Sequence, residues 1–427
     1  MYPIVDFRGV VMSYACVIEL FMLDGAKWEE LMLRRDRIHS SQGRGSRHLK
    51  SEKGGSMRTF FLSSALGALI AASTVVTAAA ADKAKVFLSM SYIGNDWQAE
   101  AANTVRAMAL SKDLKDKIDL EVQVAGPNAQ KQIQQINAMV QAGAKAIVVY
   151  PISPTALNLV VRNACSKGVH IFTYDAEITE LCAHNVHIDQ KEAGTKAAQW
   201  LADRLGGKGN IVYLSGVPGT STDTLRTEGS MEVFAKYPEI KVVAQTPGMW
   251  SQAVTRTEMS KVLATRDWKD IDGVLGQAGC FTIFSMQDEA GIPDDQKKPC
   301  SGEGSNGHRI QMLPLDAAVD GANGSYRPMA APSFSYASPP VSAAYALKLA
   351  AKAIEGQEIP HDVIVPLPEI TNENVKICLE GSFEEMKSGC NVFQPSIITN
   401  PGWFAEIFNA ETPEIGLNAA LTGQPEF

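Results

Sequence analysis

Acidic, basic, amide and aromatic side chains stand just after several strand-like runs of this sequence. A carboxylate, a guanidinium and an amide suit neighbouring hydroxyl groups, because each offers two hydrogen-bonding groups at a fixed separation. Tryptophan offers a flat apolar face against which the C–H surface of a sugar or polyol can pack. These residue types therefore predict a site for a polyhydroxylated ligand. The residues are Tyr92, Asn95, Trp97, Asp175, Arg226, Trp250, Gln277 and Glu303.

The same strand ends argue against catalysis. They carry no Ser/His/Asp or Cys/His arrangement and no histidine. A carboxylate pair formed by Asp175 and Glu303 would suit an exported glycoside-acting enzyme, but an ion pair with Arg226 would engage such a carboxylate. His184 and His187 lack a third ligand for a metal. We therefore expect no enzyme, no metal and no cofactor.

Strand-like and helix-like segments alternate from residue 85 onward. This alternation predicts α/β architecture with parallel sheets covered on both faces, and the number of strands favours two similar lobes. A (β/α)8 barrel is the alternative. Because the carboxyl ends of parallel strands share one edge, the polar residues above should meet there. The predicted strands are 86–90, 120–124, 146–150, 169–174, 210–214, 240–245, 273–275, 298–302 and 330–334, and the helices are 97–109, 130–142, 154–166, 190–205, 222–235, 252–265, 281–290 and 341–354.

An export signal is predicted inside the chain and not at its start. Residues 57–81 have a short positive beginning, an apolar run and an A-x-A site, which is the layout of a secretory signal peptide cleaved near Ala81. A transmembrane anchor is the alternative, but polar residues interrupt the run. Residues 1–56 form an upstream extension that we do not expect in the mature protein. The net charge of -8 gives no reason to expect nucleic acid as a partner.

The cysteines are consistent with export. One of the seven, Cys16, lies in the part expected to be removed, which leaves an even number. They form three couples of sequence neighbours, and an even count in an exported chain predicts disulfides, although the spacing leaves the pairing open. Free buried thiols in a cytosolic protein are the alternative. The disulfide candidates are Cys165, Cys182, Cys280, Cys300, Cys378 and Cys390.

Residues 85–366 resemble the type I periplasmic binding proteins, in the ribose-binding branch that serves sugar ABC transporters. The resemblance implies two lobes joined by a three-segment hinge and closing on a ligand. Lobe one would comprise 85–188 and 337–366, lobe two 189–336, and residues 367–427 would be an extension on lobe two, held by Cys378 and Cys390. The motifs that carry the resemblance are Asn95-Asp96-Trp97, Ile147 to Pro154, Ile171 to Asp175, Gly219 to Ser221 with Arg226 to Gly229, and Gly356 with Pro360.

The resemblance also implies individual roles. Asn95 and Trp97 would be first-loop contacts, Asp175 would bind hydroxyls, and Trp250 would stack on the sugar. The remaining assignments are Arg226 as the binding arginine, Glu303 in place of the usual aspartate, and Tyr336 beside the hinge. Three positions depart from the ribose binders by lacking polar groups, namely Ala176, Ala278-Gly279 and Ala337. Losing these hydroxyl partners argues against ribose and favours another sugar or a polyol.

We therefore expect a monomeric periplasmic solute-binding protein that delivers a small sugar or polyol to the membrane subunits of an ABC transporter. A sensory co-receptor of the same fold, presenting its ligand to a membrane receptor, is the alternative. A transcriptional repressor of this lobe architecture would need an N-terminal helix-turn-helix. Residues 1–56 show no such pattern.

Overall fold

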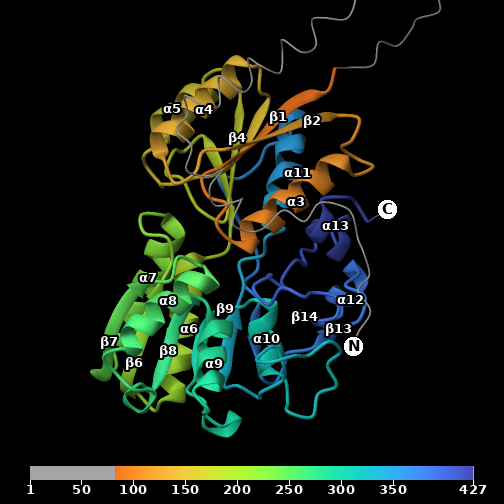
Figure 1. Cartoon of the computed structure of the whole chain (residues 1–427). Helices are drawn as coiled ribbons and strands as arrows, with labels where there is room; N and C mark the ends of the chain where they lie inside the picture. The colour runs from red at the N-terminus through yellow and green to blue at the C-terminus, as the bar shows by residue number, and fades with distance from the viewer. Residues whose placement is uncertain (1–81, 427) are drawn as a thin grey trace, which may run out of the picture. The chain divides into compact units, whose positions relative to one another are not determined.

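The computed structural model describes residues 82–426. The predicted upstream extension and signal peptide lie outside these residues. The first of two large sheets has the strand order β11-β5-β4-β3-β1-β2, and all its strands are parallel. Figure 1 shows this sheet with β1, β2 and β4 labelled. Its strands are β1 (Ala84–Met90), β2 (Ile118–Val124), β3 (Ala146–Tyr150), β4 (His170–Tyr174), β5 (Ala183–His187) and β11 (Asp362–Ile364).

The second sheet has the order β12-β10-β9-β8-β6-β7, and only the pairing of β12 with β10 is antiparallel. Two open parallel sheets confirm the predicted fold class, and the barrel alternative is wrong because neither sheet closes on itself. The strands are β6 (Lys208–Ser215), β7 (Glu239–Pro247), β8 (Gly273–Ala278), β9 (Cys300–Glu303), β10 (Ser333–Tyr336) and β12 (Glu369–Thr371).

Helices cover both faces of the first sheet. Because side chains alternate along a strand, Val86 and Leu88 of β1 join one buried cluster with α3 and α11, whereas Phe87 joins another with α4 and α5. The helices are α3 (Asp96–Leu110), α4 (Ala129–Gln141), α5 (Asn158–Cys165) and α11 (Ser342–Ile354). The start of α5 lies later than predicted, because residues 154–157 form a turn.

The second sheet is covered in the same way. Ile211 and Tyr213 of β6 pack with α6 and α7, and Val212 and Leu214 pack with α8 and α9. The helices are α6 (Gln190–Arg204), α7 (Ser221–Phe234), α8 (Gln252–Leu263), α9 (Cys280–Glu289) and α10 (Asn306–Met312). Of the residues described, none belongs to a helix that is both long and apolar enough to span a bilayer.

The chain passes between the two sheets three times. It crosses after β5 to reach α6, after β10 to reach α11, and between β11 and β12. We call the residues around the first sheet lobe one and those around the second sheet lobe two. Three connections of this kind form the three-segment hinge that the fold class implied.

The C-terminal segment, residues 372–426, contacts both lobes. It contains β13 (Ile377–Cys378), α12 (Phe383–Lys387), β14 (Val392–Phe393) and α13 (Leu417–Thr422). Its Glu406 forms an ion pair with Arg309 of α10, whereas α13 packs against α3, where Asn103 donates to the carbonyl of Ala420. The sequence predicts that this segment lies on lobe two. In the structure it also contacts lobe one.

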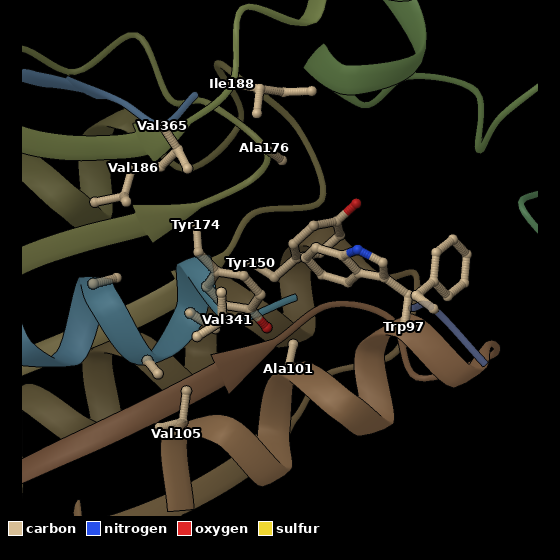
Figure 2. Close-up of a cluster of buried hydrophobic side chains, with 14 of the residues drawn as sticks. Trp97, Ala101, Val105, Tyr150, Tyr174, Ala176, Val186, Ile188, Val341 and Val365 are labelled. Carbon is tan, nitrogen blue, oxygen red and sulfur yellow. The ribbon is translucent and has the colours of Figure 1, made fainter. Parts of the chain in front are cut away.

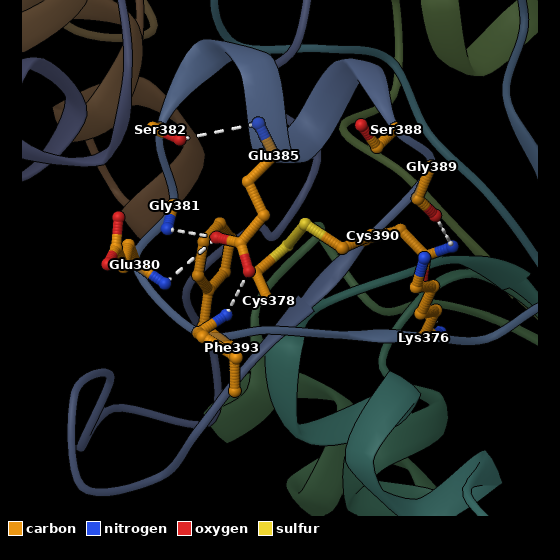
Figure 3. Close-up of a disulfide and its surroundings, with 12 residues drawn as sticks. Lys376, Cys378, Glu380, Gly381, Ser382, Glu385, Ser388, Gly389, Cys390 and Phe393 are labelled. Carbon is orange, nitrogen blue, oxygen red and sulfur yellow. Dashed lines mark hydrogen bonds between the residues drawn. A yellow bond between two sulfur atoms is a disulfide. The ribbon is translucent and has the colours of Figure 1, made fainter.

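All six cysteines expected in the mature chain form disulfides. The pairs are Cys165–Cys182, Cys280–Cys300 and Cys378–Cys390, so the free-thiol alternative is wrong. Figure 3 shows the third disulfide, which ties β13 to the residues after α12. Beside it, the carboxylate of Glu385 accepts hydrogen bonds from the backbone N–H groups of Leu379, Glu380 and Gly381 at 2.5–2.8 Å. Disulfide and carboxylate together fix this turn of the C-terminal segment.

Candidate functional site

A small cavity lies between the two lobes at the carboxyl ends of the parallel strands. Its volume is about 10 Å³, which is enough for the centre of one water molecule. Lobe one supplies residues from the start of α3 and the ends of β3 and β4, and lobe two supplies residues from α7, the loop after β7, and β9. The lining residues are Asn95, Trp97, Gln98, Tyr150, Asp175, Thr222, Arg226, Trp250, Glu303 and Phe404.

Arg226 and Glu303 form a buried ion pair in this cavity. Nη1 of Arg226 lies 3.0 Å from Oε2 of Glu303, and Nη2 lies 3.3 Å from Oε1. Nε of Arg226 donates to Oε1 of Gln190 at 2.8 Å, and the guanidinium lies 5.1 Å from the ring centroid of Tyr336. The two charged residues are only 1% and 5% exposed. The guanidinium of Arg226 is therefore rigidly placed, because both Nη atoms bind Glu303 and Nε binds Gln190.

Close packing of α6 on α7 brings Arg226 to Gln190. A Cβ at Gly194 would lie 2.1 Å from the backbone oxygen of Arg226, and a Cβ at Gly229 would lie 2.2 Å from that of Lys191. Only glycine permits this approach of the two backbones. The glycines therefore position the arginine for the cavity.

Asp175 holds its carboxylate in the cavity from a left-handed backbone conformation. Its φ is 60°, which aspartate tolerates better than most residues. Oδ1 accepts hydrogen bonds from Nε2 of Gln190, at 2.9 Å, and from the hydroxyl of Ser338, and Oδ2 accepts from Thr222 at 3.4 Å. Strained backbone is often retained where it positions a functional group. The partners come from α6, the hinge and α7, so Asp175 links both lobes.

The two tryptophans are fixed by their indole N–H groups. Nε1 of Trp97 donates to the carbonyl of Ser338 at 2.7 Å, and the indole is stacked on Tyr174 with an angle of 10° between the planes. Figure 2 shows Trp97 beside Tyr150 and Tyr174. Nε1 of Trp250 donates to Gln277 at 3.1 Å. Both indoles therefore face the cavity as rigid apolar surfaces.

The backbone around Trp250 is adapted to present this side chain. Met249 and Trp250 have φ values of 56° and 52°, so two consecutive residues are left-handed. A Cβ at Gly216 would lie 2.2 Å from the Trp250 ring, so the glycine provides the space that the indole occupies. The turn at residues 216–220, between β6 and α7, thus accommodates an aromatic side chain.

Three predicted residues lie outside the cavity lining. Gln277 lies behind Trp250, where its amide also donates to Tyr213 at 3.0 Å. Tyr336 lies beneath Arg226 and donates to the carbonyl of Gln277 at 3.4 Å. The hydroxyl of Tyr92 reaches the carbonyl of Met249 in the other lobe at 3.5 Å. Gln277 and Tyr336 therefore support Trp250 and Arg226 of the cavity lining, and Tyr92 forms a contact between the closed lobes.

The cavity also contains residues that the sequence did not single out. Gln98 lies in the predicted helix 97–109, and Tyr150 could have been found as the last residue of the predicted apolar strand 146–150. Thr222 lies in the first turn of α7, four residues before Arg226, which is a usable signal. Phe404 lies in the aperiodic C-terminal segment, and nothing local marks it.

The charges of the cavity do not favour an anionic ligand. Two carboxylates face one guanidinium, so the cavity has no surplus positive charge. Burial raises the pKa of Glu303, and Asp175 adds to this effect while Arg226 opposes it. Burial disfavours the charge of Arg226, but Glu303, Tyr336 and Asp175 together outweigh that cost, so the pKa of the guanidinium is raised. Neutral hydroxyl groups are therefore the ligand groups that this set suits.

One group of potential metal ligands occurs among residues 82–426, away from this cavity. It consists of Cys378, Glu385 and Cys390. Both sulfurs belong to a disulfide and the carboxylate is engaged by backbone N–H groups. These residues do not fit a metal ion.

Comparison with known proteins gives a consistent picture. The family described as "Periplasmic binding protein domain" matches residues 86–358. The "Xylitol-binding protein" of Mycolicibacterium smegmatis is 29% identical over 266 residues, which cover 62% of this chain and 72% of that protein.

Solved structures show the same fold. An ABC transporter solute binding protein from Thermobispora bispora has a TM-score of 0.58 at 24% identity, covering 68% of this chain and 86% of that one. A periplasmic solute binding protein from Actinobacillus succinogenes, with bound D-allose, has a TM-score of 0.57 at 23% identity, covering 68% and 98%.

Proposed function

This chain belongs to the family of periplasmic binding proteins, and on that premise we propose that it captures a small neutral sugar or polyol between its lobes and delivers it to the membrane subunits of an ABC transporter. The observation that carries the proposal is the meeting of Asp175, Arg226 and the two tryptophans in one cavity between the lobes. The relative that binds xylitol supports the same ligand class.

Hydrogen-bonding capacity supports a ligand rich in hydroxyl groups. Of the five N–H groups of Arg226, three are used by Gln190 and Glu303, which leaves two without a partner among residues 82–426. Thr222 and Asp175 add a hydroxyl and a carboxylate beside them. Donors and acceptors at this spacing can bind adjacent hydroxyls, while Trp97 and Trp250 pack on the carbon chain.

Within this class we favour a polyol of about five carbons as the first ligand to test. Ala176 and Ala278, both buried, replace groups with which ribose binders hold a pentose ring. An acyclic polyol can rotate its hydroxyls toward the polar groups that remain. We assign hydroxyl binding to Asn95, Asp175 and Arg226.

Ligand entry requires the lobes to separate. The cavity holds far less than a five-carbon molecule, and it is closed by contacts across the lobes. Asn95 donates to the carbonyl of Trp250 at 3.4 Å, and the backbone N–H of Glu177 donates to Ser221 at 2.7 Å. These contacts, and those of Asp175 with Gln190 and of Tyr92 with Met249, are individual hydrogen bonds that must break for the hinge to open.

The test is a thermal-shift and calorimetry series on the exported form, which we propose begins after Ala81 and resides in the periplasm. Xylitol, other pentitols, hexitols, pentoses, hexoses and sugar acids would each be added. We expect one-to-one binding of at least one neutral polyol or sugar, and compaction on binding in small-angle scattering. The absence of stabilisation and of compaction with every member would overturn the proposal.

A further inference from the structure

We infer that Phe404, in the C-terminal segment, contacts the bound ligand and limits the length of ligand that the cavity accepts. The inference rests on the proposed function. Phe404 lies outside residues 86–358, the part of the chain that matches the family, yet it lines the same cavity as Trp97 and Glu303. It is 3% exposed, so its ring is packed into the molecule.

The backbone of Phe404 is held on both sides of the cavity. Its N–H donates to Oε1 of Glu100 at 2.8 Å, and Glu100 lies one turn after Trp97 on α3. The residue also pairs in an antiparallel bridge with Ser305, two residues after Glu303. Phe404 is therefore fixed between α3, which carries Trp97, and the N-cap of α10, which closely follows the strand that ends at Glu303.

The residues before Phe404 are bound to the first residues of α10. The N–H of Asn306 donates to the carbonyl of Trp403 at 2.6 Å, and the N–H of Gly307 donates to that of Pro401 at 2.9 Å. A Cβ at Gly307 would lie 2.6 Å from Cβ of Pro401, so the segment and the helix are in close contact. The position of the ring is thus built into the fold.

An aromatic ring at this place has a definite effect on a polyol. It offers an apolar face for C–H groups and no partner for a hydroxyl, so a chain that extended past it would lose a hydrogen bond to water without replacement. A ligand of matching length gains packing there. The ring therefore favours a ligand that ends before it.

The test compares Phe404→Ala, Phe404→Leu and Phe408→Ala by calorimetry with xylitol and with a hexitol. Phe408 is a matched control because it belongs to the same segment but packs on Phe383, with ring centroids 5.1 Å apart. We expect Phe404→Ala to bind xylitol about tenfold more weakly and to lose part of the preference for xylitol over the hexitol. Phe408→Ala should bind both as the wild type does.

The outcomes separate the two proposals. Unchanged affinity and preference in Phe404→Ala, with a wild type that binds xylitol, would overturn this inference alone. A wild type that binds no neutral polyol or sugar would overturn the proposed function and this inference with it. If Phe404→Ala does not fold, Phe404→Leu decides, since leucine fills apolar space but lacks the flat face, and wild-type binding by that variant would overturn the inference.

Discussion

The guanidinium of Arg226 and the carboxylate of Glu303 face each other in a bidentate ion pair, buried in the cavity between the lobes. The pair is held from both sides, because Gln190 binds Nε of Arg226 and the backbone N–H of Ser338 donates to Glu303 at 2.9 Å. Desolvating two charges is costly, and such a pair is retained more readily for positioning than for stability. The arrangement presents the remaining N–H groups of Arg226 in a fixed direction.

Breaking this pair from one side should destabilise the protein more than removing both charges. We expect Arg226→Met alone, or Glu303→Leu alone, to lower the free energy of unfolding by roughly 3–5 kcal/mol, because each leaves an uncompensated buried charge. The double variant should lie closer to the wild type. Chemical denaturation of all four proteins measures the coupling, and strictly additive losses would contradict it.

The carboxylate of Asp175 should make a large contribution to the affinity for the ligand. Asp175→Asn retains the shape but removes the charge, and Asp175→Ala removes both. We expect the alanine variant to weaken binding of the cognate polyol by roughly 2–5 kcal/mol, with the asparagine variant intermediate. Asp119→Asn, at an exposed position on β2, is the control. Calorimetry that finds Asp175→Ala silent would place the ligand elsewhere.

Glu100 should make stability depend on pH. Burial raises the pKa of its carboxyl well above 4.5, although the N–H of Phe404 opposes the shift. Its Oε2 has no hydrogen-bond partner in the part of the chain that the structure describes. Because the folded-state pKa is the higher one, the contribution of Glu100 is complete below about pH 4.5 and is lost as the pH rises through the folded-state pKa.

We therefore expect the stability of Glu100→Gln, relative to the wild type, to increase as the pH is raised from about 4.5 toward neutrality. Denaturation at a series of pH values measures the difference between the two curves. Glu121→Gln is the matched control, because Glu121 is exposed on β2. Parallel curves for wild type and Glu100→Gln would show that the residue is not responsible.

The disulfide Cys280–Cys300 should contribute to stability through the loop that it closes. With a sequence separation of 20 residues, its loss in Cys280→Ala/Cys300→Ala should cost about 3 kcal/mol by loop entropy. The variant Cys165→Ala/Cys182→Ala, which removes the disulfide with a separation of 17, should lose a similar amount of stability. Melting temperatures under oxidising conditions measure both losses. An unchanged melting temperature, or free thiols in the unreduced wild type, would count against these bonds.

Much of the fold could be predicted because buried parallel strands are continuous apolar runs. The strand β3, with the sequence AIVVY, begins and ends at the predicted residues, and β8 begins at the predicted residue. In contrast, β5 was missed, since its sequence AHNVH is polar and its place beside the hinge comes from pairing with β4 and β11. The short helix α10 was missed for a similar reason, because it is stabilised by the C-terminal segment.

The sequence predicts those cavity residues that the ends of parallel strands place at one edge. Asp175 follows β4, Glu303 ends β9 and Arg226 lies on the helix after β6, so the topology of the parallel sheets brings them to one edge. Gln277 follows the predicted strand 273–275 but lies within β8, and its amide is engaged by neighbours behind Trp250, which depends on side-chain packing. Phe404 reaches α3 across 304 residues of sequence, and no local pattern predicts such a contact.

The contacts of the C-terminal segment set a limit on how far the lobes can part. Glu406 is bound to Arg309 of lobe two at 3.2 Å, and Glu414 is bound to Lys348 of lobe one at 2.9 Å. Only residues 407–413 lie between them, so the Cα atoms of Glu406 and Glu414 can be at most about 29 Å apart when this stretch is fully extended. While both ion pairs hold, residues 407–413 set an upper limit on the separation of the lobes, and the contacts of Phe404 with Glu100 and Ser305 must break before that limit is reached. The length of residues 407–413 therefore limits the size of the solute that can enter the cleft. This limit is independent of how the closed site selects among solutes.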